Sequence, residues 1–167
     1  MAYVITNSRA GFQPIATTST VKNHALGTVV HAVDPTFGEG EFIYLLGVGS
    51  TVVGSVVGYE LSTYQTALAP VGTAIPRAIA FAMSANVASQ YGWYQIGGIA
   101  VAKKALATSL ATGVAVAVKT VGLISSTGSL KEVSGAITCL VSSAKSASSL
   151  TTVQLMISRP RMQGRIT

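Results

Sequence analysis

Short apolar runs, each closed by a turn signal, follow one another along the chain. The run 27–33 is rich in β-branched residues and ends at Asp34-Pro35, a pair that initiates turns. Gly38 and Gly40 then lead into a mostly apolar run at 41–46, which is typical of a buried strand. Between 47 and 58, repeated glycines separate pairs of valines, and this pattern favours bulged strands over a helix.

The same pattern continues after a turn region at 69–76. Gly97-Gly98 predicts a tight connection between two strands that pair as a hairpin. The segment 104–112 is ambiguous, because the spacing of Leu106 and Leu110 fits one face of a helix but the run is short. Strands are predicted at 79–87, 90–96, 99–102, 114–118, 121–124, 136–141 and 153–157.

About nine or ten short strands at turn-punctuated intervals predict an all-β fold, a sandwich or barrel of short antiparallel strands. The first 22 residues differ, because isolated aromatic and aliphatic residues stand there among Gly11, Pro14 and a polar run at 17–20. Such a composition is typical of an extended arm. We therefore expect an extended N-terminal arm at 1–22 and a single β-rich domain at 23–167 with a basic C-terminal tail.

Charged side chains are scarce. The 167 residues include 11 Lys or Arg and 5 Asp or Glu, whereas charged residues make up about a quarter of a typical soluble domain. Apolar residues make up 49% of the chain, yet the most apolar stretch of spanning length, 99–118, is interrupted by the Lys103-Lys104 pair. A bare surface that does not face lipid predicts a subunit covered by other protein subunits.

The charges are also unevenly distributed. Residues 1–60 hold two basic and four acidic side chains, a net charge of −2, whereas residues 61–167 hold nine basic side chains against Glu132, a net charge of +8. An acidic protein surface or nucleic acid would suit the basic part, but nucleic-acid binding normally brings tighter clustering of Lys and Arg. The N-terminus lacks the basic start and apolar run of a signal peptide, so we expect synthesis in a cytoplasm.

Motifs for catalysis or cofactor binding are weak throughout the sequence. His24 and His31 lack the further ligands that zinc needs, and the glycines at 47–49 have the spacing of neither a nucleophile elbow nor a phosphate loop. Three carboxylates cluster locally, namely Asp34, Glu39 and Glu41. Their spacing matches no calcium loop, so we interpret them as an acidic loop facing solvent or an interface. We expect no enzyme activity, no metal, no cofactor and no small-molecule substrate.

An aromatic patch lies at Tyr91, Trp93 and Tyr94. In an extended strand, Tyr91 and Trp93 point to one face and Tyr94 points to the other. Trp93 fits three roles: an anchor in the core, a hot spot between subunits, or a stacking platform for a sugar or a base.

Three segments carry a resemblance to a known family: SRAGFQPI at 8–15, HALGTVVHAVDPTFGEGEFIYLLGVGSTVVGSVV at 24–57, and AIAFAMSANVASQYGWYQIGGIAVAKKA at 78–105. Their G-F-Q-P-I arm, DPTFGEGEFIYL turn and ASQYGWYQI-GG hairpin resemble tailed-bacteriophage head decoration proteins, also called cement proteins. The likeness covers roughly the first 105 residues. The later part departs from it, with its lysines and its Arg159-Pro-Arg161 tail.

The resemblance implies a structural virion protein that binds the outer surface of a phage capsid and stabilises contacts between major capsid protein subunits. The expected partners are the major capsid protein and further copies of this chain, as a dimer or trimer, with no membrane and no direct nucleic-acid contact. The expected location is the virion, after synthesis in the host bacterial cytoplasm. We expect capsid or intersubunit contacts at Tyr3, Ile5, Arg9, Phe12, Pro14, Trp93, Arg159 and Arg161.

Three other functions fit parts of the sequence. Trp93 and its neighbouring tyrosines fit a carbohydrate-binding or adhesion module on a virion or cell surface. The basic part fits a nucleic-acid binder whose affinity falls steeply with salt. Low charge combined with high β propensity fits a self-polymerising fibre.

Overall fold

The computed structural model describes residues 4–6, 11–71, 76–106, 108–127, 132–139 and 151–163. Every secondary-structure element assigned in these residues is a β-strand, which confirms the predicted all-β class. The strands are β1 (Val4–Ile5), β2 (Thr18–Ser19), β3 (Val29–Asp34), β4 (Gly38–Leu46), β5 (Val56–Tyr59), β6 (Thr66–Leu68), β7 (Ala78–Ala82), β8 (Tyr91–Lys103), β9 (Ala115–Thr120), β10 (Leu123–Ser126), β11 (Glu132–Thr138) and β12 (Thr152–Met162).

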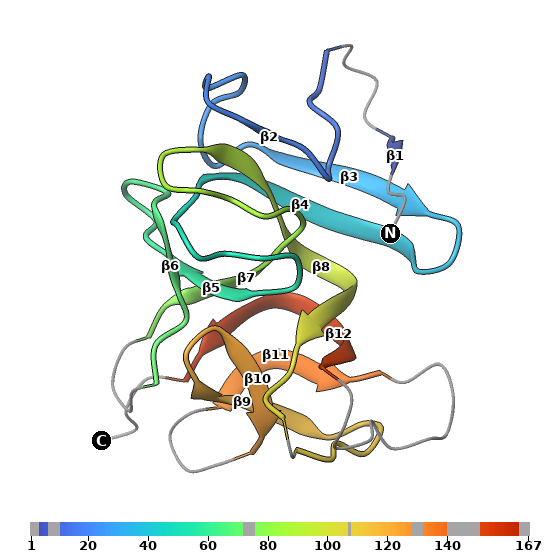
Figure 1. The fold of residues 1–167 in the computed structure, drawn as a ribbon. Coiled ribbons are helices and arrows are strands. Elements are labelled where there is room, and N and C mark those ends of the chain that lie inside the picture. The colour runs from blue at the N-terminus through green and yellow to red at the C-terminus, as the bar shows by residue number, and fades with distance from the viewer. Residues whose placement is uncertain are drawn as a thin grey trace.

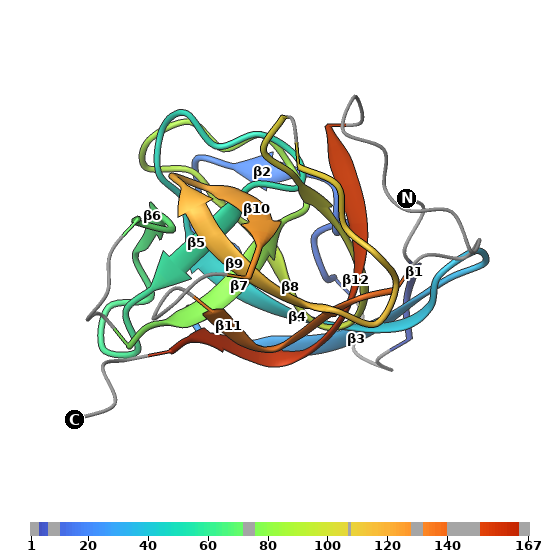
Figure 2. The same cartoon turned by 90° about the horizontal axis from the view of Figure 1, so that it is seen from below.

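Antiparallel ladders join the strands in the order β1-β3-β4-β8-β7-β12-β11-β9-β10, with a further pairing between β8 and β12. Strand β2 pairs with β8, and β5 pairs with both β6 and β7. Strands β3 and β4 lie at one end of the molecule, β9 to β11 lie at the other, and β8 runs between them (Figure 1). Seen from below, β9 and β10 lie in front of β7 and β4 (Figure 2), an arrangement like that of a sandwich.

Strand β8 is continuous, so the predicted hairpin at Gly97-Gly98 is wrong. Residues 91–97 pair with β4 and residues 97–103 pair with β12, so one strand serves both ends of the molecule. The register against β4 shifts between Gln95 and Gly97, so a bulge lies at Ile96, and Gly98 close to it has a φ of +89°. A side chain on Gly98 would overlap the carbonyl oxygen of Glu39, so the close approach of β4 also requires glycine there.

Three clusters of buried apolar side chains form the core. The first lies among β5, β7 and the strands β8 to β12, the second lies between β4, β8 and β5 to β7, and the third lies on the opposite face of β3, β4 and β8. The largest fully buried side chains are Trp93, Tyr44, Tyr94, Phe42, Phe81, Leu45, Ile79, Leu110, Ile124, Leu155, Met162 and Gln95. Burying one large apolar side chain stabilises the fold by about 1.5–3 kcal/mol, so these clusters supply most of the driving force.

The described part of the predicted arm lies against the sheet. Thr18 and Ser19 pair with Gly92 and Tyr91 of β8, and Ile15 is only 3% exposed. This part of the chain, residues 11–22, therefore contributes to the third core cluster. The segment 104–112 contains no helix in its described residues, which resolves the ambiguity of its leucine spacing.

We expect the substitution Gly98→Ala to destabilise the protein strongly. It would place a Cβ in a left-handed backbone conformation and against the Glu39 carbonyl at the same time. The expected loss is on the order of 2–4 kcal/mol in the free energy of unfolding, measured by urea denaturation.

Gly38→Ala is the matched control, because Gly38 also has a positive φ, of +72°, but has open space where a Cβ would stand. It should cost only the conformational strain, about 1 kcal/mol. Equal losses for the two variants would show that the close approach of β4 to β8 is not a constraint.

Candidate functional site

Aromatic side chains of the two central strands meet the N-terminal segment on one face of the sheet. The ring centroids of Trp93 on β8 and Tyr44 on β4 are 4.9 Å apart, and the ring of Phe12 lies 6.1 Å from Trp93. His24 packs among them, with centroids 5.0 Å from Tyr44 and 5.4 Å from Trp93. Ile5 of β1 packs against the same group. We call Phe12, His24, Tyr44 and Trp93 the aromatic cluster.

The side chain of Trp93 is completely buried, so it makes no contact with a capsid or a second subunit as it stands. Of the three roles that the sequence left open, the structure supports the core anchor. Tyr91 lies on the same side of the strand as Trp93, and Tyr94 lies on the other side in the second core cluster, as the alternation predicted. The proposed contact role of Trp93 was wrong because the segment from residue 11 onward covers the ring.

Gln13 holds this segment in place, and sequence reasoning missed it as a key residue. Its carbonyl oxygen accepts a hydrogen bond from the indole nitrogen of Trp93 at 2.9 Å, and its backbone N–H donates to Nε2 of His24 at 3.1 Å. Its side-chain oxygen accepts hydrogen bonds from Asn23 Nδ2 at 2.9 Å and from the Tyr44 hydroxyl at 3.2 Å. Its side-chain nitrogen donates to the Thr17 carbonyl at 2.7 Å. One 9% exposed residue thus makes five hydrogen bonds.

A signal for this role was present in the sequence. Gln13 stands between Phe12 and Ile15 in a stretch whose apolar residues were expected to anchor the arm. An amide flanked by buried side chains must find partners for both its donor and its acceptor, which makes it a candidate for a structural network. The partners themselves lie as many as 80 residues away in the chain, on β8, so only the fold identifies them.

Burial sets the protonation states in the aromatic cluster. It lowers the pKa of His24 from its ordinary value of 6.5, and it raises the pKa of the Tyr44 phenol. Nε2 of His24 accepts a hydrogen bond from the Gln13 N–H, so the imidazole is neutral when the segment is in place.

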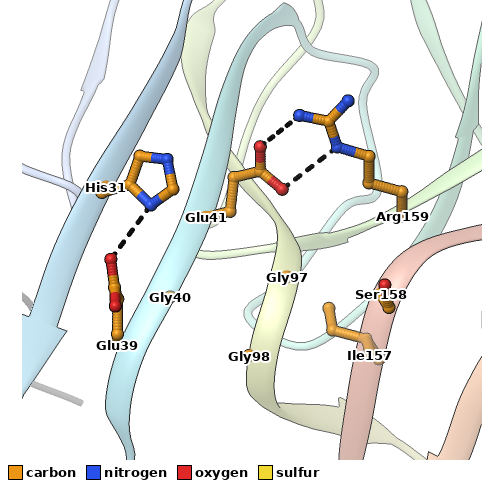
Figure 3. Close-up of a pocket in the computed structure, with 9 residues that line it drawn as sticks. All are labelled: His31, Glu39, Gly40, Glu41, Gly97, Gly98, Ile157, Ser158 and Arg159. Atoms are coloured by element: carbon orange, nitrogen blue, oxygen red, sulfur yellow. Dashed lines mark hydrogen bonds and ion pairs between the residues drawn. The ribbon is translucent and has the colours of Figure 1, made fainter.

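A polar hollow of about 350 Å³ lies on the other side of the sheet, between β3, β4, β8 and β12 (Figure 3). It is lined by His31, Glu39, Gly40, Glu41, Gly97, Gly98, Ile157, Ser158 and Arg159. Two ion pairs cross it. Nδ1 of His31 lies 3.2 Å from a Glu39 oxygen, and Arg159 meets both oxygens of Glu41, at 2.5 and 3.2 Å.

The Glu41–Arg159 pair connects β4 with β12 across Gly97 of β8, beside the bulge. The pairing register aligns Glu41 with Gly97, and Gly97 with Ser158, so the two charged side chains come together over a residue without a side chain. Hydrogen bonding to Glu41 raises the pKa of Arg159, whose side chain is 72% exposed. Arg159 also has a φ of +39°, a conformation that few residues with a side chain adopt.

The three carboxylates that cluster in the sequence separate in space. Asp34 is buried and accepts hydrogen bonds from the backbone N–H groups of Thr36 and Phe37, at 2.8 and 3.0 Å, which closes the β3–β4 turn. Glu39 and Glu41 face the polar hollow, each with its own basic partner. Within the part of the chain that the structure describes, no group of three or more His, Cys, Asp or Glu residues is arranged to hold a metal ion.

The predicted contact residues do not form one site. Ile5, Phe12 and Trp93 meet in the third core cluster, whereas Arg159 lies at the polar hollow. Pro14 is exposed, and its carbonyl accepts two hydrogen bonds from Thr17 in a turn. Arg161 is exposed on β12, opposite Ala78 of β7. Tyr3 and Arg9 lie outside the described residues.

Comparisons with protein-family models, with curated proteins and with solved structures each gave no match to this chain. Among the described residues, no helix has the length and apolar character needed to cross a membrane.

We expect Gln13→Ala to destabilise the N-terminal segment and the core cluster beneath it. The substitution removes the three side-chain hydrogen bonds and leaves Asn23, Tyr44 and Thr17 without those partners. A loss of about 1–3 kcal/mol is expected, because the buried Tyr44 hydroxyl is left unsatisfied, whereas the exposed Asn23 and Thr17 can bond to water. Urea denaturation followed by the emission of Trp93 measures it.

Thr17→Val is the control in the same segment. It removes a solvent-exposed hydroxyl hydrogen bond to Pro14 but keeps the carbonyl that Gln13 uses. The expected loss is about 1 kcal/mol or less. If both variants lose the same stability, Gln13 is an ordinary surface residue of the segment and its network contributes nothing.

Proposed function

We propose that this chain is a structural subunit that binds the outer surface of a phage capsid and stabilises contacts between major capsid protein subunits. The sequence resemblance indicates the capsid as the partner. The observation that carries the proposal is an apolar row on the outer face of the strands β8, β12, β11 and β9.

The apolar row consists of Ile99, Met156, Ile137 and Ala115. Met156 stands opposite Ile99 on β8 and opposite Ile137 on β11, and Ile137 stands opposite Ala115 on β9. Residues opposite one another in antiparallel strands point to the same face. Met156 is 50% exposed and Ile137 is 43% exposed, while their neighbours Leu155, Ile157 and Ala136 are buried in the first core cluster. The row is therefore an uncharged strip on the outside of the fold.

A strip of this kind suits attachment to a repeating protein surface. Four side chains across adjacent strands, about 4.8 Å apart, form a narrow contact that is weak by itself. Contacts of this size give durable binding when several are made together on one lattice. Binding that occurs only on the assembled lattice then stabilises that lattice by mass action.

The carbohydrate-binding alternative loses the feature that favoured it. It required Trp93 as an exposed stacking platform, and the ring of Trp93 is fully buried beneath residues 11–24. The proposal of a capsid-binding subunit does not depend on that ring.

We expect Met156→Lys to reduce binding to expanded phage heads by a factor of about ten or more, because an ammonium group buried in an apolar contact costs several kcal/mol. The measurement is co-sedimentation of purified protein with heads prepared without it, followed by electron microscopy of the particles. The fold should tolerate the change, since Met156 is half exposed.

Val87→Lys is the control, because Val87 is 58% exposed and lies in the loop before β8, away from the apolar row. It should bind as the original chain does. Failure of the original chain to bind any head preparation would contradict the proposed function, whereas unchanged binding by Met156→Lys would contradict only the assignment of the apolar row.

A further inference from the structure

We propose that residues 11–24 form an acid-sensitive latch on the sheet, whose closed shape is held at neutral pH by the acceptor nitrogen of His24 and which is released when that nitrogen takes up a proton. The inference concerns the chain by itself and does not rest on the proposed function. We call residues 11–24 the latch.

The latch is attached mainly through Gln13. The pairing of β2 with β8 involves two residues, and Gln13 accepts hydrogen bonds from Trp93 on β8 and Tyr44 on β4, while its own N–H donates to His24 within the latch. Because these bonds share one residue, a displacement of Gln13 weakens them together.

His24 is the one member of this network that changes charge near neutral pH. Its Nε2 must carry a lone pair to accept the N–H of Gln13. Once protonated, Nε2 presents an N–H to another N–H, and the partly buried imidazolium lies against the rings of Phe12, Tyr44 and Trp93. The repulsion acts directly on Gln13, the residue that attaches the latch.

No titratable neighbour of His24 among the described residues supplies a negative charge that would offset the charge of the imidazolium. The titratable side chains facing it are Tyr44 from β4 and, stacked on Tyr44, Tyr91 from β8, and phenols stay uncharged in mild acid. Lys22, the nearest charged residue along the latch, is exposed and has the same sign as an imidazolium. Burial is the cause that lowers the pKa of His24, with no charge partner contributing.

The sign of the pH dependence follows from this lowered pKa. A released His24 binds protons near its ordinary value of 6.5, and the latched His24 binds them only at lower pH. The closed latch is therefore fully stable above about pH 6.5 and loses stability as the pH falls through the pKa of the closed state.

The chain allows a direct test, because it contains one Trp and two His. Trp93 lies beneath the latch, so its emission should shift reversibly to the red between pH 7 and 5, with a midpoint below 6.5, in the original chain and in His31→Gln. His24→Gln should show no such shift, since its amide oxygen accepts the Gln13 N–H and does not protonate. Far-ultraviolet circular dichroism should stay constant through the step, which separates latch release from global unfolding.

A second measurement applies if His24→Gln is already red-shifted at pH 7 because the smaller side chain packs poorly. In the original chain, the amide resonance of Gln13 and the imidazole resonance of His24 should then titrate with one common midpoint. Constant Trp93 emission in the original chain, separate midpoints for the two resonances, or an equal shift in a well-packed His24→Gln variant would each overturn the proposal.

Discussion

The N-terminal part of this fold depends on satisfying the buried indole N–H of Trp93 and the polar groups around it. An unpaired polar group in such a place costs about 1–3 kcal/mol, and the surrounding side chains are mostly aromatic and apolar. Gln13 supplies the acceptor for the indole and partners for Tyr44 and His24. Ile15 and Phe12 of this segment consequently pack into the third core cluster, and the sheet face beneath them is a buried surface as long as Gln13 stays in place.

A second constraint comes from β8, which belongs to both ends of the molecule. A strand of 13 residues can pair with β4 in its first half and with β12 in its second half only if it changes direction between them. The bulge at Ile96 and the Gly97-Gly98 pair beside it provide that change, and the missing side chains leave room for Glu41 and Arg159 to meet there. The polar hollow is thus a by-product of the same bulge that joins the two ends.

The strand content was predictable from local patterns, whereas the site was not. The β-branched run that became β3 and the apolar runs that became β4, β9 and β12 are visible in the chain itself. Gly97-Gly98 was misread because a glycine pair marks a hairpin turn and a bulge equally well, and only the partners of β8 distinguish them. Trp93 was predicted to be a contact residue because the sequence does not show what covers it. The covering segment lies 80 residues earlier in the chain and accepts a hydrogen bond from the indole through Gln13.

The few acidic side chains of the described residues are mostly occupied within the fold. Three of the described carboxylates pair with basic side chains, Glu39 with His31, Glu41 with Arg159 and Glu60 with Arg77, and Asp34 closes a turn. The apolar row carries no charge, but Lys103 follows on the same face of β8. Protein interfaces combine an apolar centre with a polar rim. A partner of the apolar row would therefore meet Lys103 at the edge of the row, so an acidic group beside an apolar patch is the feature to expect on that partner.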